Sequence, residues 1–112
     1  KYGVNFTELA PGSSSALLHR HSLQEEFIYI LAGNPTVILD DREIEMSPGM
    51  CVGFTPSGVA HKLINKTNQP VTYLEIGDRI CGDEVTYPED DLMAKMDENK
   101  KWIISHKDGR PY

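Results

Sequence analysis

The stretch GSSSALLHRHSLQEEFIYILAG, residues 12–33, holds the pattern that decides both the fold and the chemistry of this chain. Its central feature is the pair His19 and His21 on either side of Arg20. In a helix, side chains two residues apart point to nearly opposite sides, so the two imidazoles could not bind one ion. In a strand, side chains alternate between the faces, and both imidazoles leave the same face. The pair therefore predicts a strand over residues 16–22 with two candidate metal ligands on one side.

An acidic residue, Glu26, opens the next apolar run after the connection formed by residues 22–25. From that position its carboxylate can return to the face that carries the histidines. Glu25 is the competing candidate, because it is adjacent and equally acidic. Strand alternation predicts that Glu25 points outward if Glu26 points inward.

A third histidine, His61, follows the turn formed by residues 56–58 and opens another predicted strand. An antiparallel neighbour across the barrel would bring it to the same place. A fourth, His106, has no partner at ligand spacing, and we interpret it as a surface residue. The predicted metal ligands are His19, His21, Glu26 and His61.

Short runs rich in β-branched and aromatic residues alternate with turn signals along the first two thirds of the chain. This spacing is typical of an antiparallel sandwich or barrel, and it predicts an all-β fold of the jelly-roll type. The predicted strands cover about 4–9, 16–22, 26–32, 36–40, 42–46, 51–54, 60–65 and 71–76.

The pattern loosens after Gly77. Residues 77–91 are expected to form an extended surface segment whose acidic residues 89–91 are solvated. Residues 92–96 and 101–106 are predicted to form a closing hairpin, with a short helix over 90–97 as the alternative. We therefore expect one domain over residues 1–112, with a core at about 4–76 and an extended C-terminal tail at 77–112.

Two segments resemble the paired motifs of the cupin family. In the first, Gly12, His19, His21, Glu26 and Gly33 match a glycine, HxH, a glutamate and a closing glycine. In the second, Gly49, Pro56, Gly58, His61 and Asn65 match a glycine, PxG, a histidine and an asparagine. The spacers after Gly12 and Gly49 are each one residue longer than the commonest form, which leaves the ligand spacings intact. The tail is also similar to that of a bacterial subgroup of small cupins whose activity is not settled.

This resemblance implies a cupin double-stranded β-helix, a jelly-roll barrel that holds a metal ion inside. Three imidazoles and one carboxylate suit one divalent transition metal ion: Mn, Fe, Ni, Co or Zn. The family includes isomerases, dioxygenases, decarboxylases and lyases of small oxygenated molecules. We therefore expect a metal-dependent enzyme of the dioxygenase or sugar-phosphate isomerase class. The alternative is a non-catalytic barrel that binds a small ligand as a sensor or storage module.

The residues beyond the ligands do not identify the reaction. A sugar-phosphate isomerase needs a cationic group for the phosphate, but Arg20 and Lys62 alternate with ligands and should point away from the cavity, so only the tail or a partner subunit could supply one. A dioxygenase needs an apolar pocket, with walls available from Ile28, Ile30, Val37 and Leu63. Tyr73 and Glu75 share a strand face and are candidates for proton transfer, although packing or surface roles are the simpler interpretation. We therefore assign no catalytic residue beyond the metal ligands.

Strand 26–32 is apolar on both faces, which predicts that one face meets the barrel interior and the other meets another sheet or subunit. We expect a homodimer through it. Trp102 and Ile104 share one face of the tail and should pack on the barrel or on a partner. The net charge of −6 argues against nucleic acid as a partner, and no apolar run is long enough to cross a membrane.

The two cysteines, Cys51 and Cys81, form neither a disulfide framework nor a metal-binding pair. We expect both to be reduced thiols, with Cys51 packed as a small apolar residue. Cysteine usage of this kind indicates a cytoplasmic protein.

Overall fold

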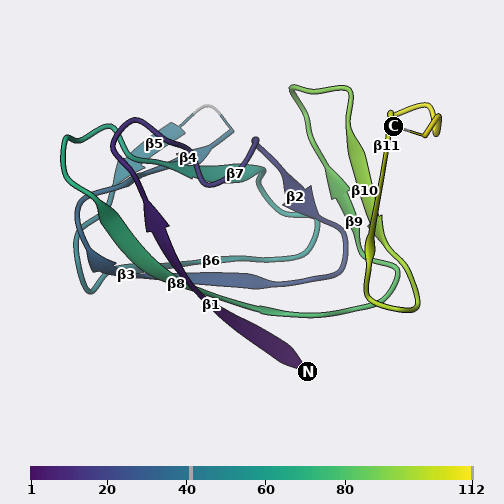
Figure 1. The fold of residues 1–112 in the computed structure, drawn as a ribbon, viewed down its shortest axis with the longest axis horizontal. Helices are drawn as coiled ribbons and strands as arrows, with labels where there is room; N and C mark the ends of the chain where they lie inside the picture. Colours follow the sequence, from purple (N-terminus) through teal and green to yellow (C-terminus); the bar gives the residue numbers. More distant parts are fainter. Residues whose placement is uncertain (41, 112) are drawn as a thin grey trace.

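The computed structural model describes residues 1–40 and 42–111, and these form strands without any helix (Figure 1). The prediction of an all-β fold is confirmed. The strands are β1 (Tyr2–Leu9), β2 (Arg20–His21), β3 (Glu26–Ala32), β4 (Thr36–Leu39), β5 (Arg42–Glu45), β6 (Cys51–Phe54), β7 (His61–Ile64), β8 (Val71–Asp78), β9 (Glu84–Thr86), β10 (Met93–Met96) and β11 (Trp102–Ser105).

Three antiparallel sheets make up the molecule. The first has the order β1-β8-β3-β6, and the second, β5-β4-β7, packs across from it. The third, β11-β10-β9-β2, stands at one end of the barrel, where Figure 1 shows the green and yellow tail strands rising beside β2. The hydrophobic core lies between the first two sheets and contains Leu9, Ile28, Ile30, Val37, Met46, Phe54, Leu63, Val71 and Tyr73.

The predicted strand 16–22 is mostly irregular, and only Arg20–His21 is a regular strand. The preceding segment still runs beside β7, because Ser14 and His19 form isolated bridges to Ile64 and His61. The hydroxyl of Ser15 accepts a hydrogen bond of 2.9 Å from the Leu63 amide. Serine side chains compete in this way with regular ladder bonds, which explains why the strand is broken without being displaced.

The tail is more structured than the sequence indicates. Residues 77–91 were expected to lie on the surface, but they contain β9, which pairs with β2 through His21 and Val85. Asp83 and Val85 are buried. The prediction of a surface segment is therefore wrong for this part of the tail. Its strand β9 supplies the hydrogen-bonding partner that β2 would otherwise lack.

The closing hairpin is confirmed, and the alternative helix over 90–97 is wrong. β10 and β11 pair antiparallel from Met93 and Ser105 to Met96 and Trp102. The turn is fixed by Asp97, whose Oδ1 accepts hydrogen bonds from the amides of Asn99 and Lys101.

Both cysteines are free thiols, as predicted, but both are exposed. The expectation that Cys51 is packed as an apolar residue is therefore wrong. Cys51 lies opposite Tyr29 in the β3–β6 ladder and shares its outward face. No helix in the described part of the chain is long and apolar enough to cross a membrane.

Candidate metal centre

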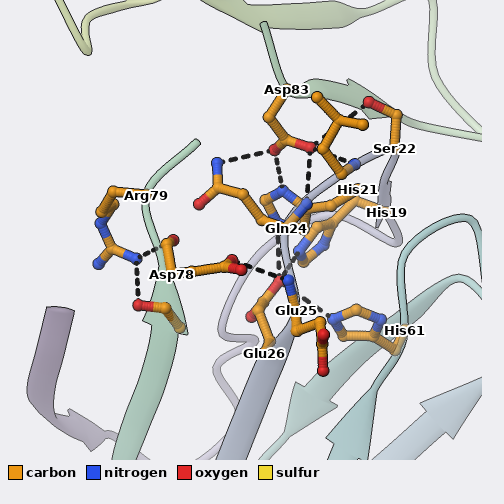
Figure 2. Close-up of polar contacts among 12 residues, drawn as sticks. His19, His21, Ser22, Gln24, Glu25, Glu26, His61, Asp78, Arg79 and Asp83 are labelled. Atoms are coloured by element: carbon orange, nitrogen blue, oxygen red, sulfur yellow. Dashed lines mark hydrogen bonds and ion pairs between the residues drawn. The ribbon is translucent and has the colours of Figure 1, made fainter. Parts of the chain in front are cut away.

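The four predicted ligand residues come together at the end of the barrel beside the tail sheet (Figure 2). Oε1 of Glu26 lies 2.7 Å from Nε2 of His21 and 3.5 Å from Nε2 of His19. Nε2 of His61 lies 3.5 Å from the same oxygen. Ligand atoms of His19, His21 and Glu26 all lie within 4.8 Å of one another. Glu26 Oε1 is thus the common point that three imidazoles approach.

The backbone brings these side chains together by strand pairing. His19 and His61 exchange both backbone hydrogen bonds, of 3.2 Å and 2.8 Å, across an antiparallel bridge. His21 leaves the same face as His19 because it lies two residues further along an extended chain. Glu26 is the first residue of β3, opposite Gly77 of β8 and Phe54 of β6. The spacing of these residues in the sequence therefore brings their side chains together through the pairing register of the strands.

In each of the three histidines, Nδ1 lies close to an oxygen atom that accepts a hydrogen bond. Nδ1 of His19 lies 2.8 Å from the Leu17 carbonyl oxygen, and Nδ1 of His61 lies 3.3 Å from that of Val59. A carbonyl oxygen only accepts hydrogen bonds, so these contacts place the proton on Nδ1. The neutral ring then presents the lone pair of Nε2 toward Glu26, which is the form that binds a metal ion.

Two buried atoms at the centre have no hydrogen-bond partner in the described chain: Oε1 of Glu26 and Nε2 of His61. The 2.7 Å contact from Nε2 of His21 to this oxygen is an ion pair only when the imidazole is protonated. Buried polar atoms are nearly always satisfied, and leaving them unpaired is costly. A divalent cation between the imidazoles and the carboxylate would satisfy both atoms, so the donor set fits such an ion.

The electrostatics of the centre favour a charged carboxylate. Burial opposes the ionised form of Glu26, but contacts from His19, His21 and His61 outweigh it and hold its pKa well below the usual range. Burial likewise opposes the charged form of His21, yet Glu26 and Asp83 together raise its pKa. The carboxylate therefore attracts positive charge at this point, whether a proton or a metal ion.

Asp83, which the sequence did not single out, is the outer partner of His21. Its Oδ2 lies 2.6 Å from Nδ1 of His21, and its side chain is fully buried. Oδ1 accepts hydrogen bonds from the amides of Leu23 and Gln24, and Oδ2 accepts another from the Gln24 side chain. These contacts link the tail to the loop between the two ligand segments and lower the pKa of Asp83 despite its burial.

Other predicted residues are placed as follows. Glu25 is exposed, while Glu26 faces inward beside the histidines, as strand alternation predicts. The ring of Phe54 stacks on His61 with centroids 3.5 Å apart, which fixes the imidazole plane. His106 lies away from the centre and pairs with Asp91 at 2.8 Å.

A cavity of about 310 Å³ opens onto the centre. This is near the lower end for small-molecule sites. It is lined by Asn5, Ser15, Ala16, His19, His21, Gln24, Glu26, Ile28, His61, Leu63, Glu75, Gly77, Arg79 and Trp102. Of the predicted apolar walls, Ile28 and Leu63 reach this cavity, whereas Ile30 and Val37 lie only in the core.

Besides Glu26 and the three histidines, the acidic and basic residues of the cavity come from β8 and its end. Arg20 and Lys62 are not among the lining residues, as predicted, but Glu75 and Arg79 are. Burial and the nearby charge of Glu26 raise the pKa of Glu75, against the influence of Arg79. Trp102 also lines the cavity, and its ring centroid lies 6.1 Å from that of His21. The tail hairpin therefore contributes a wall to the site.

Comparisons with known proteins agree with this geometry. A sugar phosphate isomerase of the cupin superfamily from Silicibacter pomeroyi superposes with a TM-score of 0.91 and 34% identity, over 99% of this chain and 71% of that one. A putative sugar phosphate isomerase from Acidithiobacillus ferrooxidans gives a TM-score of 0.87 and 27% identity, over 99% and 70%. These likenesses confirm the jelly-roll barrel together with its tail.

An uncharacterized protein of Methanocaldococcus jannaschii is 35% identical over 66 residues, which are 59% of this chain and 52% of that protein. The chain thus spans about half the length of this curated relative. The family model described as a cupin domain matches residues 5–77, which include both motifs and all four predicted ligands. On this match and the shared fold, the chain belongs to the cupin family.

Proposed function

We propose that His19, His21, Glu26 and His61 bind one divalent transition metal ion and that the chain is a metal-dependent enzyme acting on a small oxygenated molecule. The observation that carries this proposal is the set of three Nε2 atoms that lie within 3.5 Å of one buried carboxylate oxygen. Mn, Fe, Co, Ni and Zn all suit such ligands. A bound ion would supply a Lewis acid that polarises a carbonyl or hydroxyl oxygen at the cavity floor.

The chain's own residues would bind the substrate and move a proton. Gln24, Asn5 and Ser15 line the cavity and offer hydrogen bonds to hydroxyl groups. Glu75 is the best placed proton carrier, because its carboxyl lines the same cavity and its pKa is raised by burial and by Glu26. Trp102 lines the cavity and would limit the entry of water. An acid–base group beside a Lewis acid suits an isomerase of hydroxy-carbonyl compounds.

Two features favour the isomerase class over a dioxygenase. The similar proteins from Silicibacter pomeroyi and Acidithiobacillus ferrooxidans are described as sugar phosphate isomerase and putative sugar phosphate isomerase. The cavity also contains a cation, Arg79, and an ionisable carboxyl, Glu75, where a dioxygenase would need only apolar walls. A sensor that binds the ligand without consuming it is the second candidate, since the same cavity would serve either role.

The proposal is tested by metal analysis of untagged protein beside a His61→Ala variant. We expect about one transition-metal ion per chain in the parent, and a content near zero in the variant because one ligand and the stacking partner of Phe54 are lost. Sugar phosphates are then assayed for isomerisation and oxygen uptake is measured with an iron-loaded sample. Tight binding of a ligand without turnover would favour the sensor. A parent that neither contains nor takes up metal would overturn the proposal.

We also propose that the chain forms a homodimer through the outer face of the sheet β1-β8-β3-β6. On β3, Phe27, Tyr29 and Leu31 are 39%, 38% and 40% exposed. Across the ladder, Val4 and Phe6 of β1 are 54% and 66% exposed on the same face. A contiguous apolar face of this kind marks an interaction site, and a second copy of the chain would cover it.

The dimer is tested by sedimentation of a Phe6→Glu, Tyr29→Glu double variant. Buried unpaired carboxylates cost several kcal/mol, so we expect dissociation to become easier by more than about 100-fold. An Ile44→Glu variant on β5, at a residue of similar exposure outside this sheet, should leave the dimer intact. A parent that sediments as a monomer at high concentration would refute the dimer.

A further inference from the structure

One permanently charged cation lines the cavity beside the metal centre. Arg79 lies just beyond the end of β8, and among the described lining residues it alone carries an arginine or lysine charge. No sequence motif points to Arg79, because it lies outside both motifs, 18 residues after His61. Figure 2 shows it beside Asp78, on the opposite side of Glu26 from His61.

The guanidinium is fixed in place but not neutralised. Nη1 donates hydrogen bonds to the carbonyl oxygens of Gly77 at 3.2 Å and Asp78 at 3.0 Å. No carboxylate oxygen in residues 1–40 and 42–111 lies within 4.0 Å of the guanidinium nitrogens. Nε and Nη2 make no hydrogen bond to the described chain. They therefore keep their donors for a ligand, in the forked arrangement that matches an oxyanion.

The sequence leaves room for this side chain at Gly3. Gly3 and Gly77 are paired across β1 and β8. A Cβ atom on Gly3 would lie 2.7 Å from Nη2 of Arg79, closer than real Cβ atoms come, and 3.0 Å from its Cζ. A Cβ on Gly77 would instead meet the Glu25 carbonyl oxygen at 2.9 Å, and its distance of 3.4 Å from Nη1 of Arg79 is an ordinary contact. The guanidinium thus occupies a space that any larger residue at Gly3 would fill.

We infer that Arg79 binds the oxyanion group, phosphate or carboxylate, of a small anionic substrate whose remaining oxygen atoms reach the metal centre. This inference rests on the proposed function and deepens it by naming the charge class of the substrate. Arg79 and the three imidazoles line the same cavity of about 310 Å³, so one small molecule can contact both.

The charge balance of the cavity supports an anion. With a divalent ion bound, the ion and Arg79 exceed the combined charge of Glu26 and Glu75. Burial also raises the pKa of Glu75 and so favours its neutral form. The whole chain carries a net charge of −6, so an anion is drawn to this cavity rather than to the general surface.

The test compares three probes that share a three-carbon skeleton with hydroxyl groups: glycerol phosphate, glycerate and neutral glycerol. Binding to the metal-loaded chain is followed by calorimetry or by NMR shifts of the Trp102 side chain. We expect at least one anion to bind about tenfold or more tightly than glycerol, which is the scale of a charged hydrogen-bonded pair. Comparing the two anions distinguishes a phosphate site from a carboxylate site.

Two variants assign that preference to the guanidinium. Arg79→Gln removes the charge, and we expect the preference for the anion over glycerol to disappear. Gly3→Ala leaves Arg79 in the sequence but pushes its guanidinium aside, so we expect a several-fold loss. Arg42→Gln, an equal charge change at an exposed position on β5, should change nothing. Unfolding midpoints of all three variants show whether they remain folded.

The outcomes separate this inference from the proposed function. Metal content is measured in every sample, and Arg79→Gln should retain its metal because Arg79 contacts none of the four ligands. If Arg79→Gln prefers the anion as strongly as the parent does, or if neither anion binds better than glycerol, the inference fails while the metal centre stands. If the parent holds no metal, the proposed function fails, and loss of anion binding in Arg79→Gln still reports on Arg79.

Discussion

Replacing Glu26 by glutamine is expected to remove metal binding almost completely, while replacing its neighbour Glu25 leaves binding unchanged. Oε1 of Glu26 is the atom that the Nε2 atoms of His19, His21 and His61 approach. Glutamine has nearly the same shape but no charge, and its amide hydrogens cannot bind a cation. Removing a group that hydrogen-bonds to a metal ligand typically lowers metal affinity by about 10–100-fold. Removing the ligand itself should therefore lower the affinity by more than about 100-fold.

Metal titration and thermal unfolding together check this prediction. An ion that binds only the folded state stabilises it by about 2.7 kcal/mol at 100 times its dissociation constant. The parent and Glu25→Gln should show this stabilisation, whereas Glu26→Gln should unfold at the same temperature with and without metal. Glu25 is the matched control because it is exposed and uses only its backbone amide, which donates to Asp78. Equal metal affinity in both variants would mean that Glu26 is not a ligand.

The parts of the site predicted correctly are those that strand geometry determines locally. His19 and His21 share a face because a strand alternates its side chains, and Glu26 faces inward while Glu25 does not for the same reason. Strand positions before residue 78 follow from short apolar runs between turns, and the structure differs mainly where Ser15 interrupts the ladder. These features depend on neighbouring residues, so one sequence is enough to predict them.

The parts that were missed depend on contacts between distant segments. Asp83 lies 62 residues after His21, in a stretch expected to be an exposed segment, and no periodicity connects the two. Arg79 enters the cavity because β8 runs two residues further than predicted and Gly3 leaves space for the guanidinium. Such contacts depend on how distant segments pack together. The contact of Asp83 with His21 forms because the tail folds back and pairs with β2. The motifs thus predicted the four side chains that meet at Glu26, but not Asp83, which contacts His21, or Arg79, which lines the cavity.

Removing the carboxylate of Asp83 should have the largest effect on stability of any substitution at the centre. Asp83→Ala would leave five buried or half-buried donors without their acceptor: Nδ1 of His21, the hydroxyl of Ser22, the amides of Leu23 and Gln24, and the Gln24 side chain. Breaking a buried charged network by deleting one partner costs about 3–5 kcal/mol. We therefore expect a loss of that size in the free energy of unfolding, measured by denaturant titration of the metal-free protein.

Asp83→Asn separates this structural role from the effect on the metal. The asparagine oxygen can still accept the amides of Leu23 and Gln24, but its amide group would face Nδ1 of His21 with a donor. Histidine NMR should then show that His21 no longer keeps its proton on Nδ1, and we expect metal affinity to fall by about 10–100-fold with most of the stability retained. Asp97→Asn is the control, because Asp97 also accepts two backbone amides, in the β10–β11 turn away from the centre. If Asp83→Asn loses stability without changing the His21 tautomer or the metal affinity, then Asp83 only anchors the tail. Loss of both the tautomer and the affinity would instead mean that Asp83, the tail residue just before β9, orients a metal ligand, and that the barrel alone does not complete the site.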